Sequence, residues 1–234
     1  MSNQWIDIRA ANGNSFKGYL AVPKQSNGHG IVVCQEIFGV NEYIQQVAHS
    51  YAKEGFLVLA PDLFWRIKPG VQLGYTEEDL KMAFQFFGEF DTDKGVSDIS
   101  QSMEALHSLL EPNSKVGIVG FCLGGRMAYL SAARSRFDAA VAYYGVNIDE
   151  YLEEAKNIVT PLLMHFAEND EFAPLEKVER VRKSLKNNPN IHIHLYPGVG
   201  HGFARRPSNH YDLESATLAN RRSMDLFYQM ASIS

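Results

Sequence analysis

The chain is poor in cysteine, with only Cys34 and Cys122 among its 234 residues. Two cysteines do not make a disulfide framework, so we expect a reducing compartment and a cytoplasmic protein. The sequence also lacks any apolar run approaching the roughly 18 residues of a membrane-spanning helix. Its first five residues, MSNQW, have neither the basic stretch nor the apolar core of a secretory signal. We therefore expect no membrane partner.

Excess positive charge is absent as well. The chain has 22 lysines and arginines against 27 aspartates and glutamates, which gives a net charge of −5. A nucleic-acid-binding protein usually carries a basic patch, so we expect no nucleic-acid partner. The glycines form neither the G-x-G-x-x-G nor the G-K-[ST] pattern of a phosphate-binding loop. The chain does have apolar residues, at 45%, which suits one domain spanning residues 1–234.

Strand and helix patterns alternate from residue 30 onward, after two strands at 4–10 and 15–22 that form a hairpin around Asn12-Gly13. This alternation predicts an α/β fold in which a mainly parallel sheet carries helices on both faces. The remaining strands are expected at 30–34, 56–60, 115–119, 139–144, 161–167 and 191–196. The helices are expected at 41–54, 76–87, 95–110, 126–133, 174–187 and 212–230.

The segment Gly120-Phe121-Cys122-Leu123-Gly124-Gly125 lies between a predicted strand and a predicted helix. Its glycines stand two positions before and two after Cys122, which is the G-x-S-x-G spacing of a nucleophile elbow with cysteine in place of serine. Such a sharp turn strains the backbone of the nucleophile, and a β-carbon on the flanking glycines would collide across the turn. The turn also places the sulfur at a helix N-terminus, which favours the thiolate.

A nucleophile of this kind needs a base and a group that orients the base. Asp170 follows the predicted strand at 161–167, and His201 follows the last predicted strand, within the glycine-rich segment GVGHGF. Both therefore lie at carboxyl ends of strands, the same edge as Cys122. The order nucleophile, acid, histidine is also that of the elbow fold. We predict a catalytic triad of Cys122, Asp170 and His201.

The loop after the strand at 30–34 reads QEIFGVN and is expected to supply one backbone donor for an oxyanion. The predicted donors are the backbone N–H groups of Ile37 and Leu123. Glu36 lies in the same loop, where a carboxylate would oppose a developing oxyanion unless it had another partner. The Cys122 thiol is a partner consistent with this placement.

Several residues have simpler interpretations. Cys34 lies inside a predicted strand and is expected to be a core residue. His192 and His194 alternate along one face of the last strand, as two metal ligands could. No third ligand is evident, so we predict no metal site.

The segments that carry these residues resemble those of the dienelactone hydrolases, also called carboxymethylenebutenolidases. The resemblance extends from about residue 5 to the last helix. The motifs that carry it are QEIFGVN at 35–41, APDL at 60–63, GFCLGG at 120–125, YYG at 143–145 and GHGFAR at 200–205.

The resemblance implies an α/β-hydrolase fold, a Cys-His-Asp triad, no cofactor, and hydrolysis of an unsaturated lactone that bears a carboxylate. It implies that Glu36 contacts the thiol and that Arg205, rather than its neighbour Arg206, holds the substrate carboxylate. Phe38 and Tyr144, within the matching motifs, are expected to contact the substrate.

The sequence also departs from the family pattern at two places. The helix at 76–87 has Leu80-Lys81 and no second carboxylate-binding arginine, which leaves Lys81 as a candidate for that role. Gly202 stands where a serine commonly follows the histidine.

Together these features predict a cysteine-dependent hydrolase of a small carboxylated enol lactone or ester, which acts through an acyl-enzyme on Cys122. One alternative is a thiol esterase for another small ester. The other is a homologue that binds a ligand without turning it over. We expect the protein to be a monomer whose partner is the small-molecule substrate.

Overall fold

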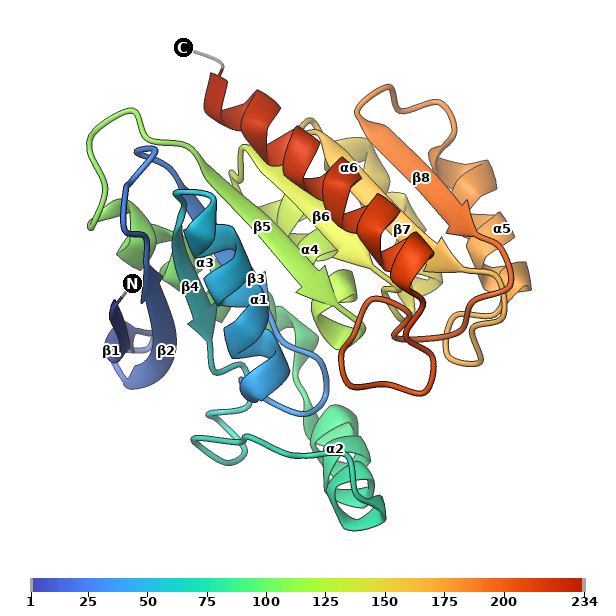
Figure 1. The fold of residues 1–234 in the computed structure, drawn as a ribbon, viewed down its shortest axis with the longest axis horizontal. Coiled ribbons are helices and arrows are strands. Elements are labelled where there is room, and N and C mark those ends of the chain that lie inside the picture. Colours follow the sequence, from blue (N-terminus) through green and yellow to red (C-terminus); the bar gives the residue numbers. More distant parts are fainter. Residues whose placement is uncertain (1, 233–234) are drawn as a thin grey trace. The chain divides into compact units, whose positions relative to one another are not determined.

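The structure is a computed structural model that describes residues 2–232 (Figure 1). These residues form two compact units, one ending at Ile118 and the other beginning at Val119. The boundary falls within strand β5 (Val116–Phe121), so each unit contains part of this strand. That the two units make up one domain stays a prediction. No helix among residues 2–232 is both long and apolar enough to span a membrane.

The sheet of the first unit has the strand order β1-β2-β4-β3-β5. It begins with the predicted hairpin, in which β1 (Ser2–Arg9) and β2 (Ser15–Val22) pair antiparallel. The parallel strands β3 (Gly30–Cys34) and β4 (Leu57–Pro61) are buried along their whole length. Such continuous burial explains why their sequences are apolar without alternation.

Helices cover both faces of this sheet. Helix α1 (Glu42–Lys53) packs on one face against β2, β3 and β4, and α3 (Thr92–His107) packs on the other (Figure 1). Helix α3 begins three residues before its predicted start, because the Asp91 side chain accepts a hydrogen bond from the Lys94 N–H and caps it there. Helix α2 (Glu77–Glu89) begins with a capping box, in which the side chains of Thr76 and Asp79 each accept from the other residue's backbone N–H.

The irregular segment 62–74 after β4 is held in place by a buried carboxylate on α3. Asp98 accepts hydrogen bonds from Trp65 Nε1 at 2.8 Å and from Arg66 Nε and Nη2 at 3.0 and 2.7 Å. The Trp65 ring in turn stacks on Phe16 of β2, with ring centroids 5.3 Å apart. The segment is therefore an ordered part of the first unit.

The strands of the second unit are in the order β5-β6-β7-β8. Strands β6 (Ala139–Tyr143), β7 (Leu162–Ala167) and β8 (Ile191–Tyr196) are parallel, as the alternation predicts. Helix α6 (Leu213–Ser232) covers one face, and α4 (Leu123–Arg134) and α5 (Leu175–Leu185) lie on the other (Figure 1). Two short 3₁₀ helices that were not predicted, η1 (Ile148–Glu150) and η2 (Leu152–Asn157), follow β6.

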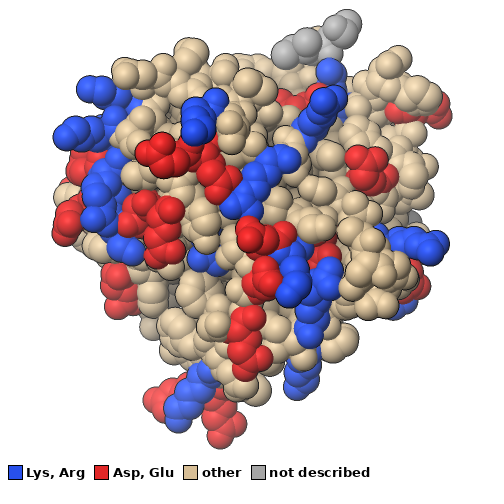
Figure 2. Space-filling view, turned by 180° about the vertical axis from the view of Figure 1, so that it is seen from behind, with Lys and Arg blue, Asp and Glu red and all other residues tan. Residues whose placement is uncertain are grey.

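Charged side chains of both signs are interspersed over the face seen in Figure 2. Several of them pair. Arg180 on α5 reaches Asp149 of η1 at 2.6 Å, and Arg134 at the end of α4 reaches Glu154 of η2 at 2.6 Å. These ion pairs tie the two 3₁₀ helices to the helices beside them.

The Asp98 cluster generates a stability prediction. Replacing Asp98 with asparagine keeps the shape of the side chain but removes the charge that Arg66 and Trp65 share. Because Arg66 remains partly exposed to water, we expect a loss of about 2–3 kcal/mol in the free energy of unfolding by urea. Asp91→Asn is the control, since asparagine caps a helix as well as aspartate does and the change should stay within about 0.5 kcal/mol. Equal losses in the two variants would contradict an anchoring role for Asp98.

Candidate active site

Cys122 occupies the sharp turn between β5 and α4 and has a left-handed backbone, with φ 54° and ψ −114°. The glycines around it leave room for this turn. A β-carbon on Gly120 would overlap the main chain of Gly124, and one on Gly125 would lie 2.6 Å from the Tyr143 carbonyl oxygen. The elbow geometry predicted from the glycine spacing is therefore present.

Hydrogen bonds of the main chain hold this strained residue. The Cys122 N–H donates to the Tyr143 carbonyl at 3.0 Å, and the Cys122 carbonyl accepts from the Arg126 N–H at 3.2 Å. Leu123 is the first residue of α4, so its N–H is one of the donors for which a helix has no internal acceptor. A backbone donor therefore lies next to Cys122, at the residue predicted to supply one.

Asp170 and His201 meet as predicted. Asp170 Oδ2 lies 2.8 Å from His201 Nδ1. The other carboxylate oxygen, Oδ1, accepts from the backbone N–H groups of Phe172 at 2.8 Å and Ala173 at 3.0 Å. With both oxygens bound and only 3% of the residue exposed, the carboxylate can orient the imidazole with little freedom of its own.

The charge balance around His201 favours its protonated form. Burial by itself would lower the pKa of the imidazole. The electrostatic interaction with Cys122 and the hydrogen bonds that the ring makes to Asp170 and Cys122 outweigh burial and raise that pKa to about 10. The imidazole thus lies between the cysteine sulfur and a carboxylate, where a positive charge on the ring is favoured.

Aromatic rings enclose the imidazole. Tyr144 and Phe172 each meet the His201 ring edge to face, with centroids 4.9 Å apart. Tyr144 is fully buried and has a left-handed backbone, with φ 35°. The predicted substrate residue Tyr144 thus contacts the base directly.

Arg205 folds back over the loop of the base. Its N–H donates to the Gly202 carbonyl at 2.9 Å. Gly202 has φ 75°, and a β-carbon there would lie 3.2 Å from Arg205 Nη2, so the guanidinium occupies the space of a side chain at position 202. Its neighbour Arg206 is exposed and stacks on the Tyr211 ring at 4.2 Å. Arg205 thus lies against the loop of His201 and Arg206 does not, while the role of Arg205 toward a substrate carboxylate stays a prediction.

Glu36, Ile37 and Phe38 follow β3 in the first unit, and all three are buried. Residues 71–75 form a strap across this loop. Gly39 pairs with Gln72, the Leu73 N–H donates to the Phe38 carbonyl at 2.8 Å, and the Asn41 side chain donates to the Leu73 carbonyl at 3.1 Å. The loop is therefore fixed within its own unit. The roles assigned to Glu36, Ile37 and Phe38 stay predictions.

The other residues considered in the sequence lie on α2, β3 and β8. Lys81 is exposed on α2, and its role toward a substrate carboxylate stays a prediction. Cys34 is a core residue, as expected, and burial raises the pKa of its thiol. His192 and His194 lie on β8, and no group of three or more metal-ligating side chains occurs among the residues that the structure describes.

One set of polar residues was not anticipated. His165 of β7 and Ser223 of α6 are fully buried and lie 3.0 Å apart, between Nε2 and Oγ. In the sequence, a histidine within an apolar run and a serine on the apolar side of a helix are the only signs of this contact.

Comparison with known proteins agrees with these observations. The family model described as "Dienelactone hydrolase family" matches residues 16–231. A "Putative carboxymethylenebutenolidase" of Azospirillum brasilense is 42% identical over 96% of this chain and 97% of its own. The carboxymethylenebutenolidase of Pseudomonas putida is 33% identical over 99% of both chains.

A solved structure shows the same architecture. The crystal structure of a "Putative Dienelactone Hydrolase" from Klebsiella pneumoniae superimposes with a TM-score of 0.87 at 27% identity and covers 97% of this chain and 98% of that one. The elbow, the order of nucleophile, acid and histidine, and nearly full-length similarity thus lead to one conclusion: the chain belongs to the dienelactone hydrolase family of ester and lactone hydrolases.

Proposed function

We propose that the protein hydrolyses a small enol lactone or ester that carries a carboxylate, through a thioester on Cys122. The observation that carries this proposal is the position of His201. Its ring is hydrogen-bonded to Asp170 at 2.8 Å and interacts electrostatically with Cys122 at the elbow. The names of the relatives from Azospirillum brasilense and Pseudomonas putida, both carboxymethylenebutenolidases, support a lactone with a carboxymethylene group as the substrate class.

In the first step, the Cys122 thiolate attacks the lactone carbonyl and forms a tetrahedral oxyanion. The Leu123 N–H stabilises this oxyanion, and by family resemblance the Ile37 N–H is the second donor. Each such donor contributes about 3–4 kcal/mol to lowering the barrier. Collapse of the intermediate breaks the C–O bond of the ring, and His201 gives its proton to the leaving oxygen.

In the second step, neutral His201 takes a proton from water, and the hydroxide adds to the thioester carbonyl. The Cys122 thiolate leaves and the product carboxylic acid departs. One of its carboxyl oxygens comes from the substrate carbonyl and the other from water. Asp170 keeps the imidazole oriented and stabilises its cation in both steps. The enolate of an enol lactone is a good leaving group, which suits a thiolate nucleophile. The carboxylate of Glu36, by resemblance, assists formation of the thiolate.

Two alternatives remain as outcomes of experiment. A thiol esterase would use the same residues on another small ester, and a ligand-binding homologue would not turn its ligand over. Aryl acetates and a panel of lactones, each assayed with wild type and with Cys122→Ala, distinguish the three. That the protein acts as a monomer in the cytoplasm stays a prediction.

The nucleophile can be tested by alkylation. Both cysteines are buried, but Cys122 is 8% exposed at the elbow, whereas Cys34 is 0% exposed inside β3 and burial raises the pKa of its thiol. Iodoacetamide at neutral pH should therefore modify Cys122 and remove hydrolysis in proportion. Peptide mass spectrometry identifies the modified cysteine, and turnover is followed in the same samples. Cys122→Ala should fold normally and lose about 10³-fold or more in kcat. Inactivation that tracks modification of Cys34 instead would refute the assignment.

The charge of His201 predicts a pH dependence. Its pKa is raised from 6.5 to about 10 in the folded protein, so the charged form adds stability that is fully present below about pH 6.5 and is lost as the pH rises through about 10. We expect kcat/KM to fall on the alkaline side with the same midpoint. Asp170→Asn removes one cause of the raised pKa, so its alkaline limb should lie at lower pH. An unchanged limb in this variant would mean that Asp170 does not stabilise the imidazolium.

Arg205 and Arg206 provide a matched pair for substrate charge. Arg205→Ala should raise KM for a carboxylated lactone by about 30-fold, the equivalent of roughly 2 kcal/mol, and should barely affect a neutral aryl ester. Arg206→Ala should change neither, because that side chain stacks on Tyr211 in solvent. Equal losses on both substrates would make Arg205 a structural residue. A selective loss in Lys81→Ala would assign a second carboxylate contact to Lys81.

A further inference from the structure

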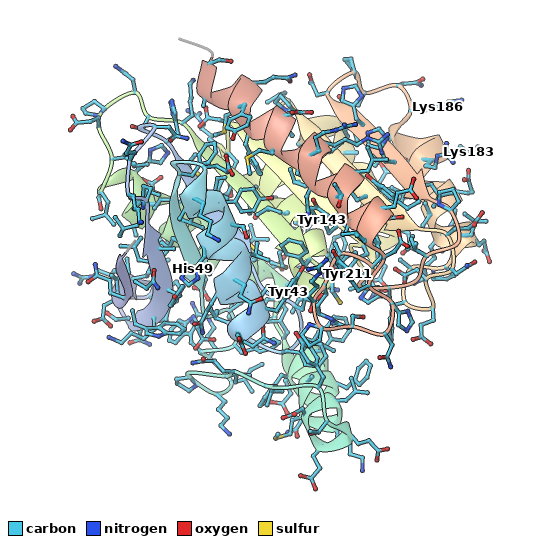
Figure 3. All side chains as sticks on the ribbon, in the orientation of Figure 1. Tyr43, His49, Tyr143, Lys183, Lys186 and Tyr211 are labelled. Carbon is cyan, nitrogen blue, oxygen red and sulfur yellow. The ribbon has the colours of Figure 1, made fainter. Side chains whose placement is uncertain are left out.

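A buried polar cluster lies between the sheet of the second unit and α6, away from the triad side chains. Ser223 of α6 is at its centre. The Ser223 hydroxyl oxygen lies 2.8 Å from the Tyr143 hydroxyl and 3.0 Å from His165 Nε2, and it donates to the Ala219 carbonyl at 2.9 Å. The side chains of Ser223, Tyr143 and His165 are all completely buried. In Figure 3 the labelled Tyr143 lies where β6 meets α6.

The protons in this cluster can be assigned. Arg222 donates to the Tyr196 hydroxyl at 3.0 Å, and this hydroxyl lies 2.9 Å from His165 Nδ1. Because Tyr196 already accepts from a cation, its one proton goes to Nδ1, and the imidazole proton is then on Nε2 and points to Ser223. Ser223 gives its own proton to the Ala219 carbonyl, so the one proton of the Tyr143 hydroxyl is shared between Ser223 Oγ at 2.8 Å and Asn220 Oδ1 at 2.9 Å. Burial, with the nearby His194 and Arg222, lowers the pKa of His165 well below its usual range, so the ring is neutral.

The same two residues that Ser223 holds also carry the strained backbone of the active site. The Tyr143 carbonyl accepts from the Cys122 N–H at 3.0 Å, and the His165 carbonyl accepts from the Tyr144 N–H at 2.7 Å. Cys122 and Tyr144 both have left-handed backbones, with φ of 54° and 35°. A residue other than glycine in this region costs about 1–3 kcal/mol and persists only where its surroundings determine it.

Stability alone accounts poorly for the cluster. A core of apolar side chains would fill the same space without the cost of burying four polar side chains, those of Tyr143, His165, Tyr196 and Ser223. Apolar contacts are non-directional, whereas hydrogen bonds fix the position of a hydroxyl along a strand to a few tenths of an ångström. The cluster therefore restrains the side chains of Tyr143 and His165 at the ends of β6 and β7, next to the elbow and to the Tyr144 ring beside His201.

We infer that Ser223 is a positioning residue of the active site, which acts through Tyr143 on Cys122 and through His165 on Tyr144 and hence on the imidazole of His201. This inference rests on the proposed function for its effect on turnover. Its effect on the reactivity of the thiol does not need a substrate. Without the Ser223 hydroxyl, Tyr143 keeps its bond to Asn220 and His165 keeps its bond to Tyr196, but the two strand ends lose the contact that they share. The pair of Cys122 and His201 is then held less closely.

The test compares Ser223→Ala with Ser102→Ala. Ser102 is a fully buried serine on α3 whose hydroxyl donates to the Asp98 carbonyl at 2.7 Å, the same helix-internal bond that Ser223 makes to Ala219. The control therefore removes the local bond and leaves the active site untouched. Urea unfolding of both variants measures the structural part of each substitution.

We expect Ser223→Ala to lower kcat about 10-fold with KM within about twofold, and Ser102→Ala to leave both unchanged. The rate of Cys122 alkylation by iodoacetamide should fall about fivefold at about pH 6, where the thiolate depends on His201, and by less than about twofold at about pH 10. Ser223→Thr, which keeps the hydroxyl, should restore the alkylation rate at the lower pH.

Tyr143→Phe removes one contact of Ser223 and keeps the stacked ring on Phe121, so it serves where Ser223→Ala does not fold. In the double variant the losses in alkylation rate should be less than multiplicative, because both substitutions break one contact. An alkylation profile of Ser223→Ala equal to that of Ser102→Ala overturns the inference. If wild type hydrolyses no lactone or ester, the proposed function fails, while the alkylation comparison still decides the role of Ser223.

Discussion

The left-handed backbone of Cys122 is the constraint on which the arrangement of the second unit depends. A side chain at this position needs glycine before and after it, a carbonyl to receive its N–H, and a helix that starts at the next residue. Gly120 and Gly125 meet the first requirement, Tyr143 the second and Leu123 the third. Because the two glycines and Leu123 belong to the turn from β5 to α4 and Tyr143 ends β6, the elbow joins these three elements.

A second constraint on the site is the charge of the His201 ring. A buried imidazolium is costly unless groups that favour its charge lie beside it, and here Asp170 and Cys122 are the neighbours that raise the pKa of His201. The carboxylate is in turn held by two backbone N–H groups from the loop after β7. The neighbours of the histidine thus favour its charged form, and in the proposed mechanism they also hold its proton where a leaving group would take it.

Much of this could be predicted from the sequence because the relevant patterns are local. The glycines around Cys122 identify the turn, and alternating strand and helix patterns identify the parallel sheet, so the fold and the meeting of Asp170 with His201 are confirmed. The 3₁₀ helices after β6 were missed because single turns have no periodicity to detect. The contact of Ser223 with His165 joins residues 58 positions apart. No local sequence pattern around either residue predicts this contact.

The shape of the elbow does not depend on which reactive atom the side chain of residue 122 carries. Its walls are main-chain atoms of Gly124, Tyr143 and Gly145 rather than side chains, so the atom that ends the side chain of residue 122 takes no part in forming them. Sulfur and oxygen would be held in the same place by the same bonds. A single nucleotide change converts a cysteine codon into a serine codon, so evolution can exchange a soft nucleophile for a hard one here without rebuilding the turn.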